Sequence, residues 1–303
     1  MKYLTGLLSV CFCLFVFTTH TVADPVELQS ANGGKLTGNL VMADGKTFSD
    51  GVVLITHGTL AHGKMNIIQY LQNNLVEAGH SVLAINLSLG APDRDFMYDC
   101  KVTHRHKHHD AMAEIGDWVS WLKTKGAPRV SLVGHSRGAN QTAWYAAESA
   151  SDIVDRVALV APSVWTAEDQ AQAYQKRYGR SLSEVLARAT KLVADGKGST
   201  VMERTGVLYC SNAEVQADTF VSYYKPDERR HTPALLNRIK VPVMVVAGSE
   251  DDVVKDLAAK VEAVSPGDHV RLETIDGAGH FFRDFFEEDL TDLVTNFLGS
   301  GSS

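Results

Sequence analysis

A serine lies at the centre of the pentapeptide GHSRG at 134–138, directly after an apolar run that ends at Val133. The segment that follows has a helical pattern, so the pentapeptide is predicted to form a turn between a strand and a helix. The glycines of such a turn permit a tight, strained backbone that presents Ser136 above the sheet. A serine held in this way is suited to attack a carbonyl carbon, provided that a base removes its proton.

A histidine and three carboxylates follow the last two predicted strands. His280 ends the glycine-rich sequence DGAGH at 276–280, and Glu250, Asp251 and Asp252 follow the strand before it. Histidine accepts a proton near neutral pH, and a carboxylate fixes its tautomer and stabilises the imidazolium. Because the carboxyl ends of parallel strands meet at one edge of a sheet, we expect these groups to converge with the serine.

Apolar strands alternate with amphipathic helices along most of the chain. The short apolar runs lie at 52–55, 82–85, 130–133, 157–160, 243–246 and 270–275. Between them, apolar residues recur at helical spacing, as at 65–75, 115–122 and 139–150. This succession predicts an α/β fold with a mostly parallel sheet and helices on both faces. An antiparallel hairpin, with strands at 26–29 and 36–42, is predicted to precede it.

The segment at 163–238 lacks this alternation and shows only helical stretches, such as 183–194. It separates the two predicted parts of the core, 24–162 and 239–298, and a Gly/Ser tail follows at 299–303. Open α/β sheets bind ligands at the carboxyl ends of their strands, so we expect a helical cap over that end. A structural elaboration away from the site is the alternative.

The order serine, acid, histidine, each after a strand, resembles that of the α/β-hydrolase superfamily of serine hydrolases. The resemblance covers about 26–298, with the segment at 163–238 in the place of the family's variable cap. It implies that Asp251, three residues after a glycine, is the acid, with Asp252 and Glu250 as alternatives. The family often carries proline where this chain has Asp252.

The resemblance also implies two backbone N–H groups that stabilise the oxyanion of a tetrahedral intermediate. One belongs to Arg137, directly after the serine. The other is assigned to Thr59 in the sequence THGTL at 56–60, with Leu60 as the alternative. His57 is expected to shape this loop and not to act as a second base.

Four residues are expected to lie close to a substrate: His57, Leu60, His135 and Trp165. Trp165 and the pair Tyr223-Tyr224 fall in the predicted cap and are candidates for lining a pocket for the acyl or leaving group.

By this resemblance, the activity is acyl transfer to water through an acyl-enzyme intermediate. A carboxylic ester of a small molecule is the favoured substrate, and the chemistry requires no cofactor or metal. An amide or peptide hydrolase of the same fold and a non-catalytic binding protein are the alternatives.

Four histidines crowd one short stretch: His104, His106, His108 and His109. A solvated loop leading into a helix start near Asp110 is the favoured interpretation. Substrate recognition by one or two of these side chains is the second. Metal binding is the last, because neighbouring Arg105 and Lys107 repel a cation and no thiolate is present.

The first 23 residues have the pattern of a secretory signal peptide, with Lys2, an apolar run shorter than a membrane span and Thr21-Val22-Ala23 before Asp24. We therefore expect an exported protein, periplasmic or secreted, with no stable membrane anchor after cleavage. The mature chain keeps Cys100 and Cys210, which form either a disulfide in an oxidising compartment or two separate buried thiols.

The chain has 303 residues and a formal net charge of −7, with no long basic run. Binding to a phosphate backbone needs clustered Lys and Arg, so nucleic acid is not an expected partner. Four phenylalanines follow the histidine of the site, and their spacing predicts that they pack the last helix into the core: Phe281, Phe282, Phe285 and Phe286.

Overall fold

One eight-stranded sheet forms the centre of the molecule, in the order β1-β2-β4-β3-β5-β6-β9-β10. The computed structural model describes residues 24–31, 33–91 and 94–299. The strands of the sheet are β1 (Asp24–Gln29), β2 (Lys35–Val41), β3 (Val52–Thr56), β4 (Val82–Asn86), β5 (Val130–His135), β6 (Val154–Val160), β9 (Val243–Gly248) and β10 (Val270–Ile275). β1 and β2 form the predicted antiparallel hairpin, and β4, β3, β5, β6, β9 and β10 run parallel to one another. The predicted mostly parallel sheet is confirmed.

Two apolar layers cover the sheet. One face packs against α1 (Asn66–Glu77) and α9 (Phe286–Gly299), whose apolar residues cluster with Val53 and Ile55 of β3. The other face packs against α2 (Asp110–Thr124), α3 (Arg137–Glu148), α7 (Pro233–Leu236) and α8 (Leu257–Glu262). Every residue of β3 and β4 is buried, as expected for strands that are covered on both sides.

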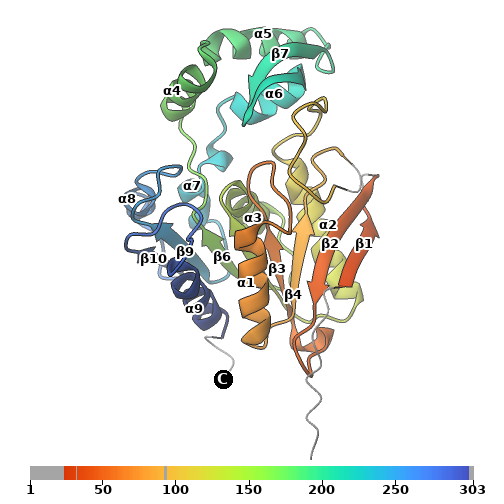
Figure 1. Ribbon diagram of the computed structural model, residues 1–303, viewed down its shortest axis with the longest axis vertical. Coiled ribbons are helices and arrows are strands. Elements are labelled where there is room, and N and C mark those ends of the chain that lie inside the picture. The colour runs from red at the N-terminus through yellow and green to blue at the C-terminus, as the bar shows by residue number, and fades with distance from the viewer. Residues whose placement is uncertain (1–23, 32, 92–93, 300–303) are drawn as a thin grey trace, which may run out of the picture.

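The chain between β6 and β9 builds a separate layer at one end of the sheet (Figure 1). Its elements are α4 (Ala167–Tyr178), α5 (Leu182–Ala194), β7 (Val201–Val207), β8 (Cys210–Gln216), α6 (Ala217–Tyr224) and η2 (Glu228–Arg230). We call this layer the cap. It has an apolar cluster of its own, centred on Phe220 and Tyr174. The antiparallel pair β7–β8 was not predicted, because the sequence analysis expected only helices here.

The phenylalanines after His280 do not all behave as predicted. Phe282 is fully buried and Phe281 and Phe286 pack against the same cluster, but Phe285 is 90% exposed. Phe282 and Asp284 adopt positive φ angles of 45° and 62°, so the chain between them is not helical and α9 begins only at Phe286. The helical spacing that placed Phe285 in the core does not apply there.

The proposed signal peptide at 1–23 lies outside the described residues. Among the residues that are described, none belongs to a helix that has both the length and the apolar character needed to cross a bilayer.

Candidate active site

Ser136 occupies the turn between β5 and α3, with φ 57° and ψ −123°. A positive φ is unfavourable for a residue with a side chain, so the surrounding chain must impose it. A Cβ atom at Gly134 would lie 2.6 Å from Cα of Ala139, and one at Gly138 would lie 2.1 Å from the carbonyl oxygen of His57. Both positions therefore require glycine, and this close packing holds the serine at the tip of the turn.

The side chains of Ser136, His280 and Asp251 form one hydrogen-bonded chain. Nε2 of His280 lies 2.9 Å from Oγ of Ser136, and Nδ1 lies 2.8 Å from Oδ2 of Asp251. With Asp251 ionised, Nδ1 carries the proton and donates to the carboxylate, while Nε2 accepts from the serine hydroxyl. The three side chains come from the loops after β10, β9 and β5, and each residue is at most 8% exposed.

Asp251 is held by more than the histidine. Its Oδ1 accepts hydrogen bonds from the N–H groups of Val253 at 2.8 Å and Val254 at 2.7 Å. Burial raises the pKa of this carboxyl, but the hydrogen bonds from His280, Val254 and Val253 outweigh it and lower the pKa below its usual value. The carboxylate therefore stays ionised. Glu250 and Asp252, the two alternatives, are exposed and form no hydrogen bond to His280.

The loop after β3 lies against the serine. A Cβ atom at Gly58 would be 3.2 Å from Cβ of Ser136. Nε of Arg137 donates to Oγ1 of Thr59 at 3.0 Å, which links the two residues expected to stabilise an oxyanion. Arg137 is the first residue of α3, so its N–H has no acceptor within the helix. Leu60, with φ 54°, turns away into the apolar cluster of the cap.

His57 lies beneath this loop and is fully buried. Its Nδ1 donates to the carbonyl of Gly58 at 2.9 Å, and its Nε2 accepts from the N–H of Leu87 at 3.0 Å and from Arg94 at 3.1 Å. Burial, and then the charge of Arg94, lower the pKa of His57 to about 3, so the ring is neutral. Both nitrogens are thus used by protein atoms, which leaves none for a substrate.

His135, the residue before the serine, is also buried. Its Nε2 donates to the carbonyl oxygen of His280 at 3.0 Å, and its ring lies 5.0 Å from the ring of His280. Burial, and then the proximity of His280, lower the pKa of His135 to about 3. This contact positions the loop that carries His280.

The cap residues expected to line a pocket behave differently from one another. Tyr223 and Tyr224 are 2% and 6% exposed and belong to the cap's own apolar cluster, so the expectation that they line an acyl pocket is wrong. The hydroxyl of Tyr224 accepts from the N–H of Leu208 at 2.8 Å. Trp165 lies on the loop after β6, half-buried, two residues beyond Ser163, whose N–H donates to the carbonyl of Ser136 at 3.1 Å.

The histidine stretch is not the solvated loop that was predicted. His104, His106 and His108 are at most 2% exposed, whereas Arg105 and His109 between and after them are exposed. His104 pairs with β8 through backbone hydrogen bonds to Glu214 and Gln216. This alternation of buried and exposed residues is the period of an extended strand, and it was the signal that the sequence analysis missed.

The buried imidazoles bond to one another and to the cap. Nδ1 of His104 lies 3.2 Å from Nε2 of His106, and Nδ1 of His106 lies 2.7 Å from the hydroxyl of Tyr223. Within the described ranges, no group of three or more His, Cys, Asp or Glu side chains is arranged to hold a metal ion.

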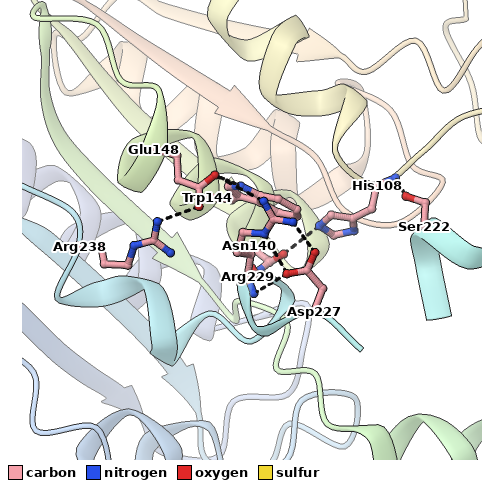
Figure 2. A network of polar contacts seen from close by, with 8 residues as sticks. All are labelled: His108, Asn140, Trp144, Glu148, Ser222, Asp227, Arg229 and Arg238. Carbon is pink, nitrogen blue, oxygen red and sulfur yellow. Dashed lines mark hydrogen bonds and ion pairs between the residues drawn. The ribbon is translucent and has the colours of Figure 1, made fainter. Parts of the chain in front are cut away.

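His108 enters a polar network that joins α3 to the cap (Figure 2). Its Nε2 donates to Oδ1 of Asn140 at 2.9 Å, and its Nδ1 accepts from Nη1 of Arg137 at 3.2 Å. Asn140 in turn donates from Nδ2 to the carbonyl of Arg229 and to the hydroxyl of Thr232, both at 3.0 Å. Arg137, the residue after Ser136, is therefore connected to the base of the cap through hydrogen bonds that involve His108 and Asn140.

A disulfide between Cys100 and Cys210 provides a second connection, with the two Cα atoms 5.4 Å apart. Cys100 belongs to the loop after β4 and Cys210 begins β8. Of the two alternatives for these cysteines, the structure contains the disulfide, and it ties the cap to the rim of the site.

Comparison with known proteins identifies the family. The family model described as alpha/beta hydrolase fold matches residues 51–287. Among solved structures, the esterase Est1E from Butyrivibrio proteoclasticus, with ferulic acid bound, is similar with a TM-score of 0.65 at 18% identity, over 90% of this chain and 97% of that one. The α/β hydrolase GrgF from Penicillium sp. sh18 is similar with a TM-score of 0.64 at 16% identity, over 91% and 96% of the two chains.

The esterase Pf2001 from Pyrococcus furiosus is similar with a TM-score of 0.58 at 18% identity, over 92% of this chain and 90% of that one. A search of curated protein sequences finds no match. The family model covers most of the chain, and the similar structures share its fold over nearly their whole length. The chain therefore belongs to the alpha/beta hydrolase fold family.

Proposed function

We propose that this protein is a serine hydrolase that cleaves carboxylic esters of small molecules through an acyl-enzyme intermediate. The observation that carries the proposal is the hydrogen-bonded chain from Ser136 through His280 to Asp251, with distances of 2.9 and 2.8 Å. A nucleophile in contact with a base that a third group orients is the arrangement that covalent catalysis needs.

In the first step His280 Nε2 takes the hydroxyl proton of Ser136 while Oγ attacks the carbonyl carbon of the ester. The negative charge that develops on the carbonyl oxygen is stabilised by the N–H groups of Arg137 and Thr59. The C–O bond to the alcohol then breaks, and His280 returns the proton to the leaving oxygen. Asp251 stabilises the imidazolium throughout and keeps its own charge.

A water molecule completes the cycle. His280 takes a proton from the water, whose oxygen attacks the acyl carbon, and the bond to Oγ breaks as the proton passes back to Ser136. The products are the acid and the regenerated hydroxyl. The low exposure of the triad, 5% for His280 and 6% for Ser136, keeps bulk water from weakening these interactions.

Esters are favoured over amides because an alkoxide leaving group demands less of the proton donor. Two of the similar structures, Est1E and Pf2001, are esterases, which supports the same choice. We further propose that the protein acts outside the cytoplasm, because a disulfide persists in an oxidising compartment. A mature N-terminus at Asp24 in protein isolated from its natural host would support export, and an intact Met1 there would argue against it.

A fluorophosphonate probe tests the nucleophile directly. We expect the wild-type protein to be labelled at Ser136 and the Ser136→Ala variant to remain unlabelled while keeping its fold. Esters of p-nitrophenol with graded acyl chains, beside a panel of peptide amides, then test the substrate class. Correctly folded wild type that neither reacts with the probe nor cleaves any ester would overturn the proposal in favour of a binding protein.

A further inference from the structure

The side chain of Arg230 is buried without enough partners. The residue is 2% exposed, and Nη1 donates to the carbonyl oxygen of Tyr223. Nε and Nη2 are both buried and have no hydrogen-bond partner. A buried cation whose donors are left unpaired is costly, so this arrangement calls for an acceptor that the chain does not supply.

The unpaired atoms belong to one edge of the guanidinium. Nε and Nη2 point in the same direction and form the fork that binds a carboxylate through two parallel hydrogen bonds. The face of the guanidinium lies over the ring of Trp165, with 4.4 Å between Cζ and the ring centroid. Stacking therefore fixes the plane of the fork, whose edge has no hydrogen-bond partner.

No carboxylate in the described part of the chain serves this edge. Among the described residues, no acidic side chain forms an ion pair with Arg230 or with Arg137. The nearby Asp227 is already engaged by Arg229, at 2.9 Å from Nε and 2.7 Å from Nη2. A cavity of about 460 Å³ adjoins Arg230, and its lining includes the cations Lys225 and Arg229 together with Asp227.

Arg230 is linked to the residues around Ser136 through Trp165 and Tyr223. Trp165 comes two residues after Ser163, whose N–H donates to the carbonyl of Ser136. Arg137 lies over the ring of Tyr223 at 5.4 Å, so the two arginines contact opposite parts of one tyrosine. Burial, and then the charge of Arg137, lower the pKa of Arg230 to about 10, which leaves the Arg230 guanidinium charged at neutral pH.

We propose that the substrate carries a carboxylate in addition to the ester, and that the Nε–Nη2 edge of Arg230 binds it, with Arg137 adding positive charge. This inference rests on the proposed ester hydrolysis, whose site it extends. Arg230 is then a specificity-determining residue, and monoesters of dicarboxylic acids are the class of substrate that fits.

Matched pairs of p-nitrophenyl esters test the inference. Each pair has acyl chains of equal length that end in either a methyl or a carboxylate: butyrate and hemisuccinate, pentanoate and hemiglutarate, hexanoate and hemiadipate. We expect kcat/KM of the wild type to favour the carboxylate in at least one pair by about 10-fold or more. No preference in any pair, with Ser136 still labelled by the fluorophosphonate, would overturn the inference and leave the proposed function standing.

The Arg230→Gln variant is expected to bring this preference close to one. The matched control is Arg229→Gln, which removes the neighbouring guanidinium from an exposed ion pair with Asp227 and should keep the preference. An Arg230→Gln variant that keeps the full preference would contradict the assignment. If that variant does not fold, Arg230→Lys keeps the charge and loses the two-pronged Nε–Nη2 edge, so it should lower the preference for the carboxylate-ended ester. An undiminished preference would show that this edge does not bind the carboxylate.

Binding provides a readout that is independent of turnover. Calorimetric titrations of the wild type and of the Arg230→Gln variant with monomethyl glutarate measure the carboxylate contact even if Ser136 proves inert. Weaker binding by the variant supports the inference. Equal binding by the two proteins, or no binding by either, overturns it.

Discussion

The guanidinium of Arg137 donates a hydrogen bond to the hydroxyl of Thr59, 3.0 Å away, across the space between two loops. One loop carries Ser136, the proposed nucleophile, and the other carries the second proposed oxyanion donor. The positions of both N–H groups are therefore coupled through a side chain that does not itself contact the triad.

Removing this bond should lower kcat. In the Thr59→Val variant the shape of the side chain is kept but the acceptor is lost, so the second N–H is less well positioned. We expect kcat for a p-nitrophenyl ester to fall by about 10-fold, with a smaller change in KM. Thr59→Ser keeps the hydroxyl and is the control. Equal kcat values for the two variants would show that the hydroxyl has no positioning role.

The acid of the triad can be tested against its neighbours. In the Asp251→Asn variant a neutral amide replaces the carboxylate that accepts the hydrogen bond from Nδ1–H of His280. The amide favours the wrong tautomer of His280 and cannot stabilise the imidazolium by charge. By analogy with the same change in a serine protease, kcat should fall by about 10⁴-fold. Asp252→Asn, on an exposed neighbour, should change kcat little. A large loss in Asp252→Asn with near-normal Asp251→Asn would reassign the acid.

The central sheet, the turn that carries Ser136 and the loop that carries His280 could be predicted from the sequence because each signal is local. A β-branched run such as 52–55 is apolar on both faces, and glycine at 134 and 138 is needed wherever two backbones approach so closely. The choice of Asp251 over Asp252 depended on family resemblance, and in the structure Asp251 lies 2.8 Å from Nδ1 of His280 and accepts two N–H groups on its other carboxylate oxygen.

The cap could not be predicted in the same way. The strands β7 and β8 contain several polar residues and two register shifts, and the turn between them places Leu208 at φ 54° instead of a glycine. The usual hairpin signals are therefore missing. His104, His106 and His108 are buried because β8 and the cap cover them, which is a long-range contact that no local pattern contains.

The buried histidines make stability depend on pH. Burial lowers the pKa of His57, His106 and His135 from 6.5 to about 3. In the unfolded chain these groups take up protons below about pH 6.5, whereas in the folded chain they stay neutral to much lower pH. Their contribution to stability is thus complete above pH 6.5 and is lost as the pH falls toward 3.

Urea unfolding at several pH values between 7 and 4.5 measures this loss. Each of these histidines should contribute about 1.4 kcal/mol per pH unit to the decrease in unfolding free energy. His106→Gln should reduce that slope by about one such increment, while His109→Gln, on an exposed side chain, should leave it unchanged. Identical slopes for wild type and His106→Gln would show that His106 is protonated in the folded protein.

The Cys100–Cys210 disulfide should stabilise the protein by closing a long loop. The two cysteines are 110 residues apart in the sequence, so the bond removes many conformations from the unfolded chain. Reduction should lower the free energy of unfolding by about 2–5 kcal/mol. The measurement is denaturant unfolding with and without a phosphine reductant, and the Cys100→Ser/Cys210→Ser variant should match the reduced wild type and be insensitive to the reductant.

This disulfide should also affect activity less than stability, because the cap keeps other attachments. The backbone pairing of His104 with β8 and the contacts of His108 with Arg137 and Asn140 do not involve sulfur. We therefore expect kcat of the reduced protein to stay within about 3-fold of the oxidised value at temperatures well below its melting point. A complete loss of ester hydrolysis on reduction, with the secondary structure intact by circular dichroism, would mean that the bond alone holds the cap in its working position.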